Sequence, residues 1–125
     1  MKSLWLVDDD STFRYVFRRI LESHDLVEQF VEFENGEDAY QALIQRLDHQ
    51  QPPPDVILLD ISMPVLDGWG FLEKLSALQS HDLKTKIYLI SSSIAASHQS
   101  PDGRFPLLAG CVTKPISVDK IYALL

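Results

Sequence analysis

The chain has 125 residues, 46% of them hydrophobic, and a formal net charge of −7. This length suits one domain over residues 1–125, and no apolar run approaches the ~20 residues that a membrane-spanning helix needs. The acidic charge argues against direct contact with a nucleic-acid backbone, while a lone cysteine, Cys111, and the lack of a signal-peptide pattern favour a cytoplasmic protein without an internal disulfide.

The first strand and the first helix are predicted from two apolar patterns. Ser3–Val7 is a short, mostly apolar run that closes on three aspartates, which is typical of a buried strand in a parallel sheet. A helix with Asp10 or Ser11 as N-cap is then expected to end near His24. Its apolar face, at helical spacing, comprises Phe13, Val16, Phe17, Ile20 and Leu21. The arginines off this face are expected to be solvated, and they are Arg14, Arg18 and Arg19.

A second strand and a second helix follow. Leu26–Phe33 is rich in Val and Phe but less purely apolar than the first strand, which favours a place at the edge of the sheet. Asn35 and Gly36 form a turn signal. The helix predicted over Glu37–Leu47 ends before the prolines at 52–54, because proline cannot continue a helix.

The third predicted strand ends on a single carboxylate. Val56–Leu59 is fully apolar, as expected of a strand that is covered on both faces, and Asp60 follows directly. Sites in open α/β sheets form beyond the carboxyl ends of the strands, so Asp60 is a candidate site residue. The alternative is that Asp60 only begins a polar turn.

The rest of the chain predicts two more strands and three helical segments. The helix after Gly68 has its apolar positions at Trp69, Leu72, Leu75 and Leu78. The strands are Lys86–Ile90, before Ser91, and Gly110–Thr113, before Lys114, and the last helix is Val118–Leu125 with Ser117 as a cap. Prolines and a glycine interrupt residues 94–106, so only a short or irregular fourth helix is expected there.

Strands and helices alternate along the whole chain. Such alternation predicts an α/β protein with a mainly parallel sheet and helices on both faces. Because parallel strands end at one edge, the polar groups that follow them should converge. These groups are Asp8, Asp9 and Asp10 after the first strand, Asp60 after the third, Ser91 after the fourth and Lys114 after the fifth.

The converging groups fit phosphoryl transfer. Carboxylates this close repel one another unless a cation intervenes, and oxygen ligands with room for water suit Mg²⁺. An Asp carboxylate can be the nucleophile, and the Lys114 ammonium and Ser91 hydroxyl can hold phosphoryl oxygens. The inferred reaction is transfer of a phosphoryl group onto Asp60. Asp8 or Asp10 as helix caps, Ser91 as a loop residue and Lys114 as a surface lysine remain alternatives.

Six short motifs occur in a defined order. They are Val7-Asp8-Asp9, Leu59-Asp60, Met63-Pro64, Asp67-Gly68, Ile90-Ser91 and Lys114-Pro115. In this order and spacing, the sequence resembles the receiver domain of two-component response regulators over essentially its whole length. The resemblance implies a single-domain, flavodoxin-like (βα)5 fold with the parallel sheet order 2-1-3-4-5.

The resemblance also implies a metal site. Asp60 takes the place of the phosphoacceptor, and Asp9 takes the place of a direct Mg²⁺ ligand, with Asp8 ligating through water. The backbone carbonyl of Ser62 takes the place of a further ligand. Asp10 matches a variable position and is not assigned to the metal.

Further roles and two departures from the family concern the last two strands. Ser91 takes the place of the Ser/Thr that moves to the phosphate, Lys114 of the lysine that pairs with the phosphate, and Pro115 of a cis proline. Many receivers carry an aromatic residue where this chain has Cys111, for which the alternative is a small buried residue. Cys111 and the interrupted segment 94–106 are two departures that put in doubt the surface through which the family usually signals. Phosphorylation is expected to reshape segment 94–106 and not to rotate an aromatic side chain.

The implied function is a phosphoacceptor and not an enzyme. It would take a phosphoryl group from a sensor histidine kinase or a histidine phosphotransfer protein and signal by contact with an unidentified downstream protein. One alternative is a Mg²⁺-dependent aspartyl-phosphate phosphohydrolase, but such enzymes usually carry a second Asp where this chain has Ser62. Another is a degenerate module that binds partners without phosphate, against which the complete acidic set and Lys114 argue.

Overall fold

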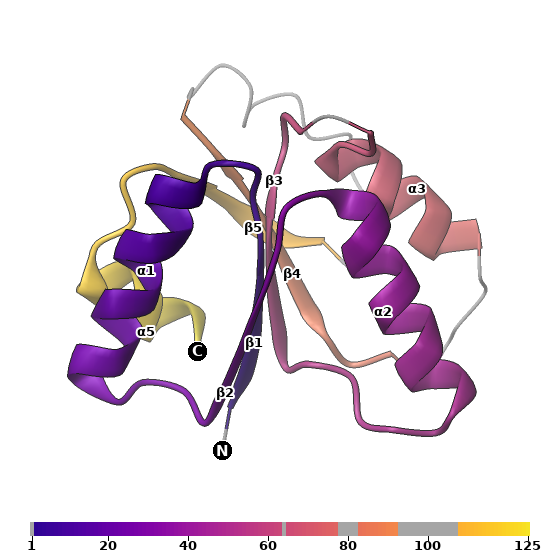
Figure 1. The fold of residues 1–125 in the computed structure, drawn as a ribbon, viewed down its shortest axis with the longest axis horizontal. Helices are drawn as coiled ribbons and strands as arrows, with labels where there is room; N and C mark the ends of the chain where they lie inside the picture. Colours follow the sequence, from indigo (N-terminus) through magenta and orange to yellow (C-terminus); the bar gives the residue numbers. More distant parts are fainter. Residues whose placement is uncertain (1, 64, 78–82, 93–107) are drawn as a thin grey trace.

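The computed structural model describes residues 2–63, 65–77, 83–92 and 108–125 (Figure 1). Its strands form one parallel sheet in the order β2-β1-β3-β4-β5, which confirms the predicted order. The strands are β1 (Ser3–Val7), β2 (Gln29–Phe33), β3 (Val56–Asp60), β4 (Lys86–Ser91) and β5 (Leu108–Thr113). The helices are α1 (Ser11–His24), α2 (Gly36–Asp48), α3 (Gly68–Ala77) and α5 (Val118–Leu124).

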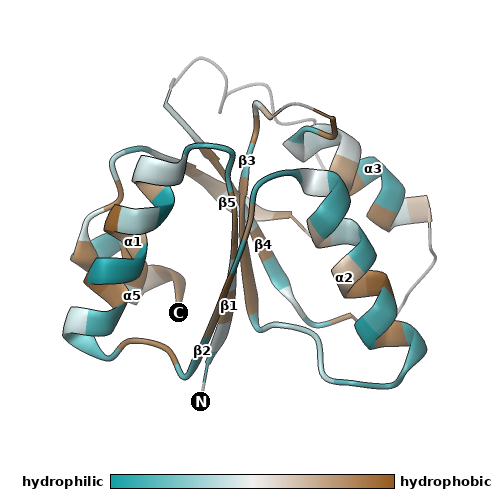
Figure 2. Cartoon of the chain, in the orientation of Figure 1, coloured by the Kyte–Doolittle hydropathy of each residue, from teal (hydrophilic) through white to brown (hydrophobic). Residues whose placement is uncertain are grey.

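Helices cover both faces of the sheet, with α1 and α5 on one face and α2 and α3 on the other (Figure 1). Alternate residues of a strand point to opposite faces. Trp5 and Leu59 therefore belong to the apolar cluster under α2 and α3, while Leu6 and Leu58 belong to the cluster under α1 and α5. Figure 2 shows mostly hydrophobic residues along the central strands, between helices that contain both hydrophobic and hydrophilic residues.

Polar side chains begin three of the helices. Asp10, and not Ser11, is the N-cap of α1, and its carboxylate accepts hydrogen bonds from the N–H groups of residues 12 and 13. Asn35 caps α2 in the same way, so the predicted turn signal is also the start of that helix. Ser117 caps α5 as predicted. Each cap satisfies N–H groups that the first turn of a helix leaves without partners.

Two strands begin at other residues than predicted. β2 begins at Gln29 and not at Leu26, because Asp25 takes a left-handed conformation that ends α1 and the chain then needs a short connection. Leu26 and Val27 still pack against the cluster under α1, so their apolar character reflects burial and not strand pairing. β5 begins at Leu108, earlier than the predicted Gly110.

Some predictions concern residues outside the described part of the chain. They are the position of Leu78 in the third helix, the Pro64 of the Met63-Pro64 motif and the irregular fourth helix over 94–106. Among the helices that the structure describes, none combines the length and the apolar character that crossing a membrane requires.

Candidate functional site

The polar groups that follow the strands lie at one edge of the sheet. β1 leads into Asp8, β3 ends at Asp60, β4 ends at Ser91 and β5 leads into Lys114. These strands are neighbours in the sheet and pair in parallel in the order β1-β3-β4-β5. Ser91 lies opposite Thr113, the last residue of β5. The pairing therefore brings these groups together from segments far apart in the sequence.

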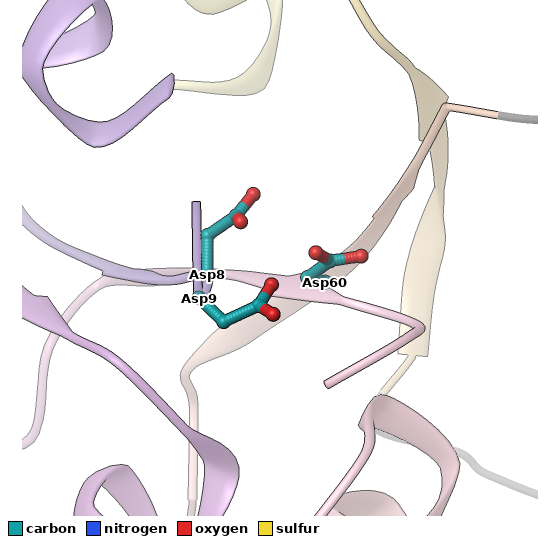
Figure 3. Close-up of side chains that lie close together, drawn as sticks. All are labelled: Asp8, Asp9 and Asp60. Atoms are coloured by element: carbon teal, nitrogen blue, oxygen red, sulfur yellow. The ribbon is translucent and has the colours of Figure 1, made fainter. Parts of the chain in front are cut away.

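Three carboxylates form the centre of the site. Asp8, Asp9 and Asp60 each offer an oxygen, and these oxygens all lie within 4.8 Å of one another (Figure 3). Asp8 is 0% exposed and Asp60 is 8% exposed, whereas Asp9 is exposed. The cluster is thus embedded in the protein on the side of Asp8 and open to solvent at Asp9. Asp10 is not part of it, because its carboxylate caps α1.

Lys114 faces this cluster. Its Nζ lies 2.7 Å from Oδ2 of Asp8 and 3.6 Å from Oδ2 of Asp60. Its backbone N–H donates a hydrogen bond to the carbonyl of Ser91 at 2.7 Å, which ties the end of β5 to the end of β4. The bond between Lys114 and Pro115 is cis, as the resemblance implied. The ammonium therefore lies between two carboxylates that come from β1 and β3.

The surroundings raise the pKa values of Asp60 and of Lys114. Burial, together with the negative charge of Asp8, raises the pKa of Asp60 to about 6, although Lys114 acts to lower it. Burial alone would lower the pKa of Lys114, but the nearby carboxylates of Asp8, Asp60 and Asp10 outweigh this, and the pKa is raised. In the absence of a metal ion, the site thus favours the charged form of Lys114 and disfavours ionisation of Asp60.

Backbone N–H groups fix the two buried carboxylates. Oδ1 of Asp8 accepts a hydrogen bond from the N–H of Asp10 at 2.9 Å, and Oδ1 of Asp60 accepts one from the N–H of Ser62 at 3.2 Å. In both residues the other oxygen, Oδ2, is the one that lies nearest to Lys114. Each carboxylate therefore has one oxygen held by its own loop and one turned toward the ammonium.

Arg14 is the residue at the site that the sequence interpretation missed. It was expected to be solvated, but its side chain is only 15% exposed, and Nη1 donates a hydrogen bond to the backbone carbonyl of Asp8. Its Nε lies 3.4 Å from Oε1 of Glu32 in β2. Arg18, the next arginine on this side of α1, also pairs with Glu32 but remains partly exposed. The sequence pattern around Arg14 in α1 does not indicate that its partner lies in β2.

The remaining predicted residues lie in β4 and β5 or shortly after β3. Ser91 is buried at the end of β4, and Ser62 is exposed in the bend that follows Asp60. Cys111 in β5 is partly buried against the cluster under α2 and α3, and burial raises the pKa of its thiol. Met63 packs against the same cluster.

This arrangement suits the handling of a divalent cation and a phosphoryl group. The three carboxylates supply the oxygen ligands that Mg²⁺ prefers, and the exposure of Asp9 leaves space for the waters that Mg²⁺ usually keeps. Lys114 supplies a positive charge beside Asp60. Fold and site together define a flavodoxin-like α/β protein with a cluster of carboxylates at the carboxyl ends of its strands.

The response regulator receiver domain family matches residues 4–125, and the chain belongs to this family. The DNA-binding transcriptional regulator NtrC of Escherichia coli K12 is 34% identical over 123 residues, which cover 97% of this chain and 23% of that protein. The chemotaxis protein CheY of Listeria monocytogenes is 32% identical over 92 residues, covering 74% of this chain and 69% of that one. Receiver domains are in general phosphoacceptors of two-component systems and not enzymes.

A solved structure agrees with the fold. The crystal structure of a two-component response regulator from Cytophaga hutchinsonii matches with a TM-score of 0.79 at 24% identity, covering 98% of this chain and 92% of that chain. By contrast, the chain spans about a quarter of the length of the NtrC relatives that it matches. The similarity to those proteins concerns their receiver domain.

Proposed function

We propose that Asp60 accepts a phosphoryl group from a sensor histidine kinase or a histidine phosphotransfer protein, and that the phosphorylated chain signals through contact with a downstream protein. Membership of the receiver family supports the general role. The position of Lys114, with Nζ 2.7 Å from Asp8 and 3.6 Å from Asp60, is the observation that carries it for this chain. An ammonium placed there opposes the negative charge on a phosphoryl group that arrives at Asp60.

The proposed step is a displacement at phosphorus. A carboxylate oxygen of Asp60 attacks the phosphorus of a phosphohistidine, a P–O bond forms, and the P–N bond to the imidazole breaks. The electron pair of that bond stays on the imidazole nitrogen, which is then free to take up a proton. Lys114 donates hydrogen bonds to a phosphoryl oxygen, and Ser91, buried at the end of β4, is the proposed hydroxyl partner of another.

Asp8, Asp9 and Asp60 are the residues that would hold Mg²⁺, together with the backbone carbonyl of Ser62. The donor set consists of oxygens, which fits this ion, and burial and the charge of Asp8 raise the pKa of Asp60 to about 6 despite the opposing effect of Lys114. When bound, Mg²⁺ supplies positive charge to phosphoryl oxygens. Asp9, the exposed member of the set, is the proposed direct ligand, and buried Asp8 is the proposed ligand through water.

The test is incubation of the protein with Mg²⁺ and acetyl phosphate, followed by intact mass measurement. The wild type should gain one phosphoryl group, and Asp60→Asn should gain none. Asp48→Asn, which removes an exposed carboxylate at the far end of α2, is the matched control and should be phosphorylated like the wild type.

Other outcomes would select the alternatives. Continuous release of phosphate from phosphate esters would indicate a phosphohydrolase, although Ser62 stands where such enzymes usually carry a second aspartate. No adduct with acetyl phosphate or with a phosphorylated histidine phosphotransfer protein would indicate a module that binds its partners without phosphate. Either result would overturn the proposed role of Asp60.

A further inference from the structure

An aromatic ring lies against the lysine of the site. The Nζ of Lys114 is 4.3 Å from the centre of the Phe13 ring. Phe13 belongs to the first turn of α1, three residues after Asp10, the last of the acidic residues that follow β1. The ammonium is therefore bounded by Asp8, by Asp60 and by an aromatic face.

Phe13 is held both at its backbone and at its ring. Its backbone N–H donates a hydrogen bond to Oδ1 of Asp10, the N-cap of α1, at 3.2 Å. Its ring packs on Phe17, with centroids 6.0 Å apart, and Phe17 is only 1% exposed. Phe17 in turn stacks on Phe30 of β2 at 6.0 Å. The helix cap and the packing on Phe17 hold Phe13 in place.

The ammonium of Lys114 needs such a support. A lysine carries its charge on a flexible four-carbon stem, and solvent competes for an ammonium whose side chain is 17% exposed. An aromatic face attracts a cation through its quadrupole and also excludes water from that side. Leucine or methionine at position 13 would fill similar space but would lack this attraction.

We propose that Phe13 is a positioning residue that holds Lys114 between Asp8 and Asp60. This inference rests on the proposed function, because Phe13 would keep the ammonium of Lys114 in place for a phosphoryl group that reaches Asp60. Phe13 touches neither the phosphoryl group nor its donor and acts only through Lys114. A site that holds its charge in advance avoids reorganising at the moment of reaction.

Phe30 offers a matched control. It is a partly buried phenylalanine that packs against the same apolar cluster as Phe13. In the part of the chain that the structure describes, no cation lies over its ring, and it sits in β2, away from the site. Phe30→Leu therefore removes a similar ring from the same cluster but leaves in place the Phe13 ring that contacts Lys114.

The experiment compares Phe13→Leu, Phe13→Tyr and Phe30→Leu with the wild type. The initial rate of phosphorylation by acetyl phosphate with Mg²⁺ should fall about three- to tenfold in Phe13→Leu, which corresponds to the loss of one partly buried cation–π contact. Phe13→Tyr keeps the aromatic face and should retain the wild-type rate, as should Phe30→Leu. Thermal unfolding of all variants shows whether each is folded at the assay temperature.

A double-mutant cycle separates positioning from packing. In the Lys114→Ala background, Phe13→Leu should leave the remaining rate unchanged, because the residue through which Phe13 acts is absent. An equal loss in both backgrounds would overturn the inference. As a readout independent of activity, the ε-methylene protons of Lys114 should show an upfield ring-current shift in the NMR spectrum that Phe13→Leu removes and Phe13→Tyr keeps.

The outcomes distinguish the two proposals. A wild type that takes up no phosphoryl group would overturn the proposed function, and with it the purpose assigned to Phe13. A wild type and a Phe13→Leu variant that are phosphorylated at equal rates would overturn the role of Phe13 alone. A missing upfield shift in the wild type would overturn the contact itself.

Discussion

The carboxylate of Asp60 is destabilised by its surroundings in the folded protein. Burial and the charge of Asp8 raise its pKa from the usual 3.8 to about 6, against the opposing effect of Lys114. Ionising Asp60 therefore costs more free energy in the folded state than in the unfolded chain. Without divalent cations, Asp60→Asn should raise the free energy of unfolding at pH 7 by on the order of 1–2 kcal/mol, as measured by urea denaturation.

The pH dependence of this difference follows from its sign. The folded state binds more protons at Asp60 than the unfolded state does between 3.8 and about 6, so the contribution of this group to stability falls as the pH rises through that window. Below the window, Asp60 is protonated in both states. The advantage of Asp60→Asn should therefore shrink toward zero near pH 4. A difference that stays constant from pH 4 to pH 8 would contradict this cause.

Val65 is held in an unfavourable backbone conformation close to the site. Its φ is 72°, in the left-handed region, where a β-branched side chain crowds the backbone, and it is 82% exposed, so little apolar burial compensates. Val65→Asn should raise the free energy of unfolding by about 1 kcal/mol, because asparagine tolerates this region. Val65→Thr keeps the branching and is the control. Equal melting temperatures for the two variants would argue against backbone strain at this position.

At the scale of the elements, the start of α2 determines the path of the loop after Asp60. The N–H of Gly36 donates a hydrogen bond to the carbonyl of Leu66 at 3.2 Å, and a Cβ on Gly36 would lie 2.4 Å from that oxygen. This contact is with backbone and cannot be relieved by a rotamer change. Gly36→Ala must displace α2 or the loop between β3 and α3.

Gly36→Ala should lower the free energy of unfolding by about 2 kcal/mol, the range typical of overpacking. Gly70→Ala in α3 is the matched control, because its new Cβ would meet mainly the end of the Leu66 side chain, which can move, and alanine favours the helix. Urea denaturation of the two variants gives the comparison. A cost for Gly70→Ala as large as that for Gly36→Ala would show that the backbone contact is not decisive.

The accuracy of the sequence-based element predictions depended on whether the deciding forces were local. β1 and the end of α1 at His24 were predicted at their observed bounds, since their apolar patterns and flanking polar residues lie within the segments themselves. The start of β2 was wrong because Leu26 and Val27 are apolar for packing under α1, not for pairing with β1. Apolar character alone does not separate these two causes.

At the scale of the whole molecule, topology explains how much of the site could be predicted. The alternation of strands and helices places the ends of parallel strands at one edge, which was enough to associate Asp8, Asp60 and Lys114. The sheet order itself came from the resemblance to a family and not from alternation. The contacts of Phe13 with Lys114 and of Arg14 with Glu32 depend on how α1 sits on the sheet, which no local pattern encodes.

The proposed binding of Mg²⁺ to the three carboxylates has a consequence for the stability of the whole fold. Three carboxylates whose oxygens lie within 4.8 Å of one another occur together only in the folded chain, so Mg²⁺ should bind the folded state preferentially. At about 100 times its dissociation constant, Mg²⁺ should raise the free energy of unfolding by about 2.7 kcal/mol. NaCl at matched ionic strength is the control, and an equal effect of NaCl would indicate general screening of the net charge instead.

The same coupling makes the effects of Mg²⁺ and of Asp60→Asn overlap. Both relieve the repulsion between Asp60 and Asp8, so Mg²⁺ should stabilise Asp60→Asn less than it stabilises the wild type. Asp9→Asn should lose most of the Mg²⁺ effect as well, but it should gain less stability without the ion, because Asp9 is exposed to solvent and its charge is screened there. Thermal unfolding of the three proteins with and without Mg²⁺ measures these differences. Strictly additive effects of Mg²⁺ and Asp60→Asn would mean that the cation binds elsewhere on the chain.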